Sequence, residues 1–199
     1  MRVGACPGLG RASSIPRQPV FERSVITGPM LKLWAAANLD GKRAFEAVLG
    51  RPLRRDELEE TTWELVEHAE GLTDADLALA GEQIAAASVE IARFFERYDL
   101  WLTPTLAQAP PLLGVLNRSV GSAAGWWNYD LEFNPWCPIA NISGGASASL
   151  PLYVNADGLP IGSMLTAAYG QESLLLRVCA QLEAASPWGE RRPSAEVRP

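Results

Sequence analysis

The fold is decided between residues 133 and 188, which read FNPWCPIANISGGASASLPLYVNADGLPIGSMLTAAYGQESLLLRVCAQLEAASPW. An apolar run at residues 148–154 is followed by Asp157-Gly158. That pair is typical of a turn, because Gly tolerates positive φ and Asp can hydrogen-bond its own backbone. A second apolar run occupies residues 161–169. The pattern therefore predicts two neighbouring strands that are antiparallel and mostly buried.

After Gly170 the apolar spacing changes from a strand period to a helical one. The expected helix spans residues 171–185, and Pro187 ends it. Its apolar face carries Leu174, Leu175, Val178, Leu182 and Ala185. Strands followed by an amphipathic helix indicate the α/β class.

The first half of the chain has the composition of helices. Residues 30–38 and residues 40–49 are expected to form two of them, with Asp40 capping the second. A third helix should open at Asp56, with Glu59 as a capping-box-like partner. Its polar side carries Glu57, Glu60, Glu64 and Glu67. An acidic face could bind a basic partner, but a solvated face is the more frequent case and is the one we expect.

A fourth helix is expected from Asp74 to about Tyr98, with Thr73 as its N-cap. Apolar residues recur along it in steps of three and four: Leu77, Ala80, Ile84, Ala87, Ile91 and Phe94. This stripe predicts a helix packed on a core. Residues 100–103 then read as a short buried strand that Pro104 ends.

Residues 121–136 are the least regular and most aromatic segment. We expect a loop here, and clustered aromatic residues in loops often line ligand sites. Trp126, Trp127 and Phe133 are the candidate substrate-binding residues. The alternative is that these side chains only seal the loop to the core, and the sequence favours neither reading.

The net charge of −6 is unevenly distributed. Residues 1–55 carry ten Lys or Arg against three Asp or Glu, whereas residues 56–199 carry seven against twenty. A basic arm could bind nucleic acid, but its arginines are scattered and lack interleaved aromatic residues. No nucleic-acid partner is therefore expected.

Metal, cofactor and membrane functions receive no support from the composition. The three cysteines, Cys6, Cys137 and Cys179, show no metal-ligand spacing, and His68 is the only histidine. An odd cysteine count and the absence of an apolar signal-peptide core favour a reducing, cytoplasmic location. We expect no metal site, no cofactor and no membrane span.

Several short motifs occur in an order that resembles the C-terminal end of the amidase signature family. They are Asn141-Ile-Ser-Gly, Ala148-Ser-Leu-Pro, Asp157-Gly-Leu-Pro-Ile-Gly and the helix that ends before Pro187-Trp188. Upstream, Tyr98-Asp-Leu-Trp-Leu-Thr-Pro-Thr followed by Ala109-Pro-Pro fits the same family in the right order. Single motifs of this length are not specific, whereas their order over half the chain is.

The resemblance implies an amide hydrolase that uses a Lys-Ser-Ser triad, in which lysine is the base and one serine the nucleophile. Those segments lie upstream of the resembled region, so no residue here is assigned a catalytic role. Ser143 and Ser147 lie in a Gly- and Ser-rich stretch that only superficially resembles a nucleophile loop. The two lysines, Lys32 and Lys42, are expected on distant, exposed helices.

The resemblance also implies a fold. We expect the C-terminal part of an amidase-like mixed sheet covered by helices, with a helical N-terminal half. Residues 1–19 should be an irregular lead-in, residues 20–188 a partial amidase-like domain, and residues 189–199 a flexible tail.

The resemblance implies that the chain is the C-terminal part of an amidase-type hydrolase, which cleaves amide C–N bonds. The chain would supply sheet scaffold and a wall of the substrate pocket, and would be inactive alone. The alternative is a non-catalytic remnant that binds a partner. The expected partners are a small amide substrate once the catalytic half is supplied, and a second copy of the chain or that half.

Overall fold

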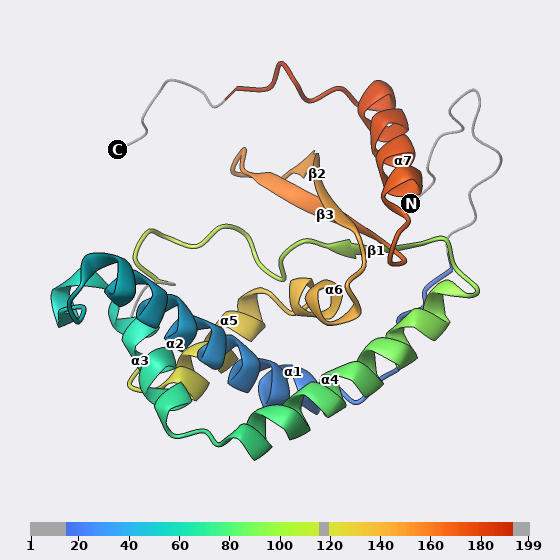
Figure 1. The fold of residues 1–199 in the computed structure, drawn as a ribbon. Helices are drawn as coiled ribbons and strands as arrows, with labels where there is room; N and C mark the ends of the chain where they lie inside the picture. Colours follow the sequence, from blue (N-terminus) through green and yellow to red (C-terminus); the bar gives the residue numbers. More distant parts are fainter. Residues whose placement is uncertain (1–14, 116–119, 193–199) are drawn as a thin grey trace.

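The computed structural model describes residues 15–115, 120–192 and no others. Most of the predicted lead-in and tail therefore lies outside the described residues. The elements in chain order are α1 (Ser24–Thr27), α2 (Pro29–Leu49), η1 (Arg55–Glu57), α3 (Glu60–Glu70), α4 (Asp74–Phe95), β1 (Leu100–Pro104), α5 (Ala123–Phe133), α6 (Cys137–Ser143), β2 (Ser147–Val154), β3 (Pro160–Ala167) and α7 (Glu172–Ala185). Figure 1 shows helices α1 to α5 gathered on one side of the sheet and α7 on the other.

The three strands form one antiparallel sheet in the order β1-β3-β2. The predicted hairpin is confirmed: Gly158 has φ of +82°, and the Asn155 amide donates to the Leu159 carbonyl oxygen at 2.9 Å. The register opposes Ala148 to Leu165 and shifts between Leu150 and Tyr153. The central strand β3 is the best buried, because it has a hydrogen-bonded neighbour on each side.

Alternation along the strands gives the sheet two different faces. Leu150, Leu165 and Ala167 point to one face and are buried together with Leu175 of α7. The predicted C-terminal helix therefore covers this face, although Ala185 at its end is exposed. Trp101 points to the opposite face and packs with Ile91 of α4 and Ile139 of α6, which joins the sheet to the helical layer.

Helix α2 corrects the prediction of two helices at residues 30–38 and 40–49. It runs unbroken over 21 residues, and Asp40 lies within it, paired with Arg43 rather than capping a new helix. The reason is tertiary: Leu31, Ala35 and Leu39 are buried along one face of α2 against α3. Packing of a long apolar face outweighs a local start signal and a mid-helix glycine.

The beginning of the third predicted helix is also corrected. Residues Arg55–Glu57 form a 3₁₀ turn, and α3 starts at Glu60 instead of Asp56. The capping role falls to another residue, because the Glu57 carboxylate accepts from the Arg54 amide at 2.8 Å. Glu64 is not solvated as predicted but 8% exposed, and its carboxylate accepts from the Gly121 amide at 3.0 Å.

Helix α4 confirms its predicted start. The Thr73 hydroxyl accepts from the Asp76 amide at 3.2 Å, and the Asp76 carboxylate accepts from the Thr73 amide at 3.1 Å. The expected stripe is buried at Ala80, Ala87 and Ile91. Helices and an antiparallel sheet together confirm the α/β class.

Candidate functional site

The segment that carries the candidate substrate-binding residues is a helix rather than the predicted loop. Ser122 caps α5 by accepting from the Gly125 amide at 3.1 Å. Aromatic residues have only modest helix propensity, so α5 depends on this cap and on packing against α3. The one local signal for a helix in this segment is Ser122, a favourable N-cap residue that the prediction of a loop did not include.

The structure places the three candidates differently. Trp127 is 1% exposed, and its indole N–H donates to the Ile26 carbonyl oxygen at 2.7 Å. Trp126 is half-buried beside it on the rim of the helical core. Phe133 lies at the far end of α5, half-buried, where its carbonyl oxygen accepts from the Ala107 amide at 2.9 Å.

Trp34 of α2 joins this group, although the sequence reading did not single it out. Its ring centroid lies 4.6 Å from that of Trp127 and 5.7 Å from that of Trp126, both edge-on. We call these three residues the tryptophan corner. Trp34 is 40% exposed, so the corner reaches from the core to the surface.

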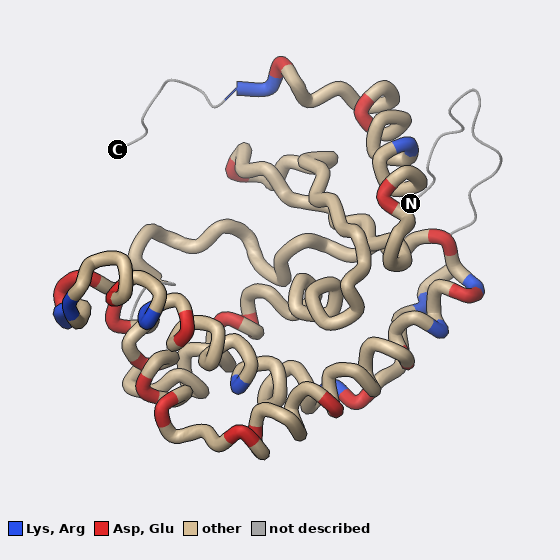
Figure 2. The backbone as a smooth tube through the Cα atoms, in the orientation of Figure 1, with Lys and Arg blue, Asp and Glu red and all other residues tan. Residues whose placement is uncertain are grey.

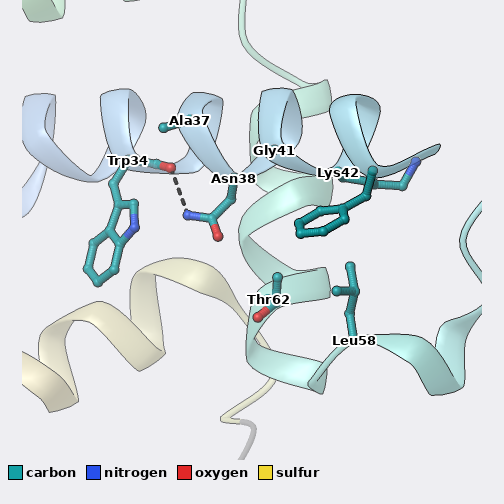
Figure 3. A pocket seen from close by; sticks show the side chains of 8 residues that line it. Trp34, Ala37, Asn38, Gly41, Lys42, Leu58 and Thr62 are labelled. Atoms are coloured by element: carbon teal, nitrogen blue, oxygen red, sulfur yellow. Dashed lines mark hydrogen bonds between the residues drawn. The ribbon is translucent and has the colours of Figure 1, made fainter. Parts of the chain in front are cut away.

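A groove opens beside the exposed edge of Trp34, between α2 and α3 (Figure 3). We call it the α2–α3 groove. It has a volume of about 330 Å³ and is lined by Trp34, Ala37, Asn38, Gly41, Lys42, Phe45, Leu58 and Thr62. Its walls are mostly apolar, with a carboxamide and a hydroxyl among them, which is the usual make-up of a small-molecule site.

A second cluster of polar groups lies on the sheet face opposite α7. The Thr105 and Ser149 hydroxyl oxygens are 2.5 Å apart across Gly162 of β3. A Cβ at Gly162 would lie 2.5 Å from the Thr105 hydroxyl oxygen and 2.6 Å from that of Ser149. Only glycine leaves room for this pair. Thr103, on the same face, has a buried hydroxyl without a hydrogen-bond partner in the described residues.

The serines of the Gly- and Ser-rich stretch have local structural bonds. The Ser143 hydroxyl donates to the Ala140 carbonyl oxygen at 3.1 Å and accepts from the Gly145 amide at 3.2 Å. The Ser147 hydroxyl lies 2.8 Å from that of Thr166. Ser143 therefore closes the end of α6, and Ser147 joins β2 to β3.

Both lysines are bound to carboxylates of the helical layer. Lys32 Nζ lies 3.0 Å from Asp76, and Lys42 Nζ lies 2.8 Å from Glu46. Lys42 corrects the expectation of an exposed side chain, because it is only 15% exposed. Each ammonium group is therefore part of an ion pair of α2, and neither is paired with a serine hydroxyl as a catalytic base would be.

Cys137 is the thiol nearest to the polar cluster, with Sγ 3.8 Å from the Thr105 carbonyl oxygen. Burial, with a smaller contribution from the Asp130 carboxylate, raises the pKa of this thiol. Burial likewise raises the pKa of Asp130. A protonated thiol is a poor nucleophile, so this geometry does not activate Cys137.

The described residues contain no group of three His, Cys, Asp or Glu side chains that could hold a metal ion. Within the same residues, no helix is both long enough and apolar enough to cross a membrane.

Comparison with known proteins defines the class. Residues 17–176 match the Amidase family, so the chain belongs to it, as the motifs of the C-terminal half suggested. A relative from Paenarthrobacter ureafaciens, 6-aminohexanoate-cyclic-dimer hydrolase, is 36% identical over 152 residues. The putative amidase AmiC of Mycobacterium tuberculosis is 34% identical over 158 residues.

The structural comparison agrees. The structure of 6-aminohexanoate cyclic dimer hydrolase matches 87% of this chain at a TM-score of 0.79 and 32% identity. A bacterial aryl acylamidase of the amidase signature family matches at a TM-score of 0.65 and 19% identity, which shows the shared fold.

The match covers only part of each relative. This chain spans 31% of the length of the Paenarthrobacter hydrolase and 32% of that of AmiC. It spans 37% of the compared hydrolase structure.

Proposed function

We propose that this chain serves in the hydrolysis of amide C–N bonds as the C-terminal part of an amidase. The observation that carries the proposal is the match of residues 17–176 to the Amidase family, together with 36% identity to a hydrolase that acts on a cyclic dimer. The sheet and its covering helices supply scaffold, and α5 supplies a wall of the substrate pocket in which Trp126 and Phe133 face the substrate and Trp127 holds the helix in place from the core.

The position of each aromatic residue sets its role in this proposal. Trp127 is bonded to Ile26 and fixes α5 against the helical layer. Trp126 and Phe133 keep partly exposed rings at the two ends of the helix, where they can meet an apolar part of a substrate. The substrate class is a small amide, since the relatives are named as amide hydrolases.

Amide hydrolysis by this chain alone is not expected. Acyl transfer needs a nucleophile beside a base and donors for the oxyanion, which together supply most of the barrier reduction. Ser143 and Ser147 are bonded to neighbours other than a base, and both lysines are bonded to carboxylates. These groups must come from the remaining two-thirds of the family fold.

Complementation tests the proposal. The upstream part of the Paenarthrobacter hydrolase is produced with and without this chain, and hydrolysis of the 6-aminohexanoate cyclic dimer is measured. Turnover is expected only in the mixture, and it should survive Ser143→Ala and Ser147→Ala in this chain. Turnover by this chain alone that either substitution abolishes would overturn the assignment of no catalytic residue.

The alternative function, a partner-binding remnant without catalysis, is favoured by one observation. Both β1 and β2 are edge strands of the described sheet, and none of the three strands carries a charged residue (Figure 2). Edge strands without charged residues pair more readily with other chains. Tight binding of the upstream part without any turnover would support this alternative.

A further inference from the structure

We propose that the α2–α3 groove binds a small neutral molecule in which an apolar body carries an N–H donor. The site goes beyond the proposed function, because Trp126, Trp127 and Phe133 do not line it. Its size, its walls, its free acceptors and its floor each point to such a ligand.

The groove has the dimensions and walls of a small-molecule site. Its volume of about 330 Å³ falls within the usual range for ligand pockets. Trp34 and Phe45 project from the same face of α2, and they remain 40% and 64% exposed. Figure 3 shows Leu58 and Thr62 on the α3 side of the groove, facing α2. Aromatic rings that stay exposed to water along one wall of a groove favour an apolar occupant.

The groove presents two neutral acceptors, the Asn38 side-chain oxygen and the Thr62 hydroxyl oxygen. The Asn38 side-chain N–H donates to the Trp34 carbonyl oxygen at 2.9 Å, which leaves Oδ1 directed into the groove (Figure 3). Neither this oxygen nor the Thr62 hydroxyl has a hydrogen-bond partner among the described residues. The one charge, on Lys42, is held by Glu46 at 2.8 Å. A ligand N–H can donate to either acceptor, and the absence of an available charge favours a neutral ligand.

Gly41 forms part of the floor in the middle of α2. A glycine in a helix interior is destabilising relative to alanine. A Cβ at this position would meet nothing within 4 Å, so packing does not require glycine. What the missing side chain does is keep the groove open.

Binding is tested with acetanilide, which joins an aromatic ring to one amide N–H. Indole N–H signals of the whole chain are followed by NMR during titration. The Trp34 signal, assigned with Trp34→Phe, should shift saturably at millimolar ligand while the buried Trp101 signal does not move. N-methylacetanilide lacks the donor and should bind about fivefold more weakly or worse.

Two glycines provide a matched pair of variants. Gly41→Ala and Gly81→Ala both replace a helix-interior glycine whose Cβ would meet nothing within 4 Å. Both should raise the melting temperature, by about 2 °C. Only Gly41→Ala narrows the groove, and it should weaken acetanilide binding about threefold or more. A gain in stability with a loss of binding cannot arise from misfolding.

Side-chain variants identify the contacts. Phe45→Ala and Thr62→Val should each weaken binding, by about fivefold. Val48→Ala, an exposed apolar change on the same helix but outside the groove, should leave binding unchanged. The proposal is overturned by no saturable Trp34 shift below about 50 mM ligand, by equal affinity for the N-methyl compound, or by unchanged affinity in Gly41→Ala.

Discussion

At the scale of single residues, two close contacts each depend on one residue: the absent side chain of Gly162 and the carboxylate of Glu57. Gly162 lets two hydroxyls meet across the central strand. The Glu57 carboxylate accepts from the Arg51 guanidinium and from the Arg54 amide in the 3₁₀ turn before α3. Both arrangements lead to measurable predictions.

Gly162→Ala should destabilise the sheet. The new Cβ would lie within 2.6 Å of both hydroxyl oxygens, so Thr105 and Ser149 must separate. Overpacking of this kind costs about 1–3 kcal/mol in the free energy of unfolding, which urea denaturation followed by fluorescence can measure. Adding Ser149→Ala should recover part of the loss, because it removes one of the two clashing oxygens. Full additivity of the two substitutions would contradict this reading.

Glu57 predicts a stability change at low pH. Two hydrogen bonds from Arg51, at 2.9 and 2.8 Å, and one from the Arg54 amide lower the pKa of Glu57 from 4.5 to about 2. Since the folded pKa is below the unfolded one, the stabilisation is complete above about pH 4.5 and lost as pH falls through about 2.

The measurement is the urea midpoint of Glu57→Gln between pH 7 and pH 2. Its deficit relative to the natural chain should be constant at neutral pH and shrink below pH 4.5. Glu59→Gln is the control, because Glu59 makes no ion pair within the described part of the chain. A deficit that does not change with pH would show that the charge of the Glu57 carboxylate does not contribute to the free energy of unfolding.

At the scale of elements, local signals decided where some helices begin and tertiary packing decided how far others run. Helix α4 begins where a Thr73–Asp76 capping box places it. Helix α2 continues through Asp40 and Gly41 because its buried face packs continuously on α3. The difference is one of magnitude, since a cap is worth about 1 kcal/mol and a buried helix face several times more.

Substitutions at the N-cap of α4 test how much a local signal contributes to stability. Thr73→Ala should lower the free energy of unfolding by about 1 kcal/mol, because the Asp76 amide loses its acceptor. Thr73→Ser keeps the hydroxyl and should lose less than half as much, as measured by thermal unfolding. Equal losses in both variants would mean that the methyl group, not the cap, is what matters.

At the scale of the whole molecule, the sheet leaves apolar side chains exposed to solvent beside its edge. Helix α7 packs on β2 and β3, and Leu102 on the edge strand β1 is 62% exposed. Leu176 on α7 is 65% exposed as well. Apolar side chains beside an unpaired strand edge favour association with another chain.

We expect the purified chain to self-associate with rising concentration through this region while its helices persist. Leu102→Lys should reduce the apparent mass seen by light scattering, because charges at an edge oppose strand pairing. Leu113→Lys, at a fully exposed position outside the sheet, should not. A monodisperse monomer without dye-binding apolar surface would remove the expectation of a partner.

The residue pattern was sufficient for features held by neighbours in sequence. The hairpin at residues 147–167 and the Thr73 cap depend on contacts within about twenty residues, and the structure confirms them. The order of the family motifs is read directly from the sequence, and the family match confirms it. Such contacts need little loop closure, so local chemistry dominates their free energy.

The three-dimensional packing decided the rest. The continuity of α2, the helical form of α5, the burial of Glu64 and the α2–α3 groove depend on partners that are distant in sequence; the bond from Trp127 to Ile26 spans 101 residues. Trp126 and Trp127 were found as an aromatic cluster, whereas Trp34 was missed because nothing near it in sequence marks the contact. An aromatic ring or a carboxylate takes its environment from whatever the fold brings to it, and that environment is absent from any local pattern.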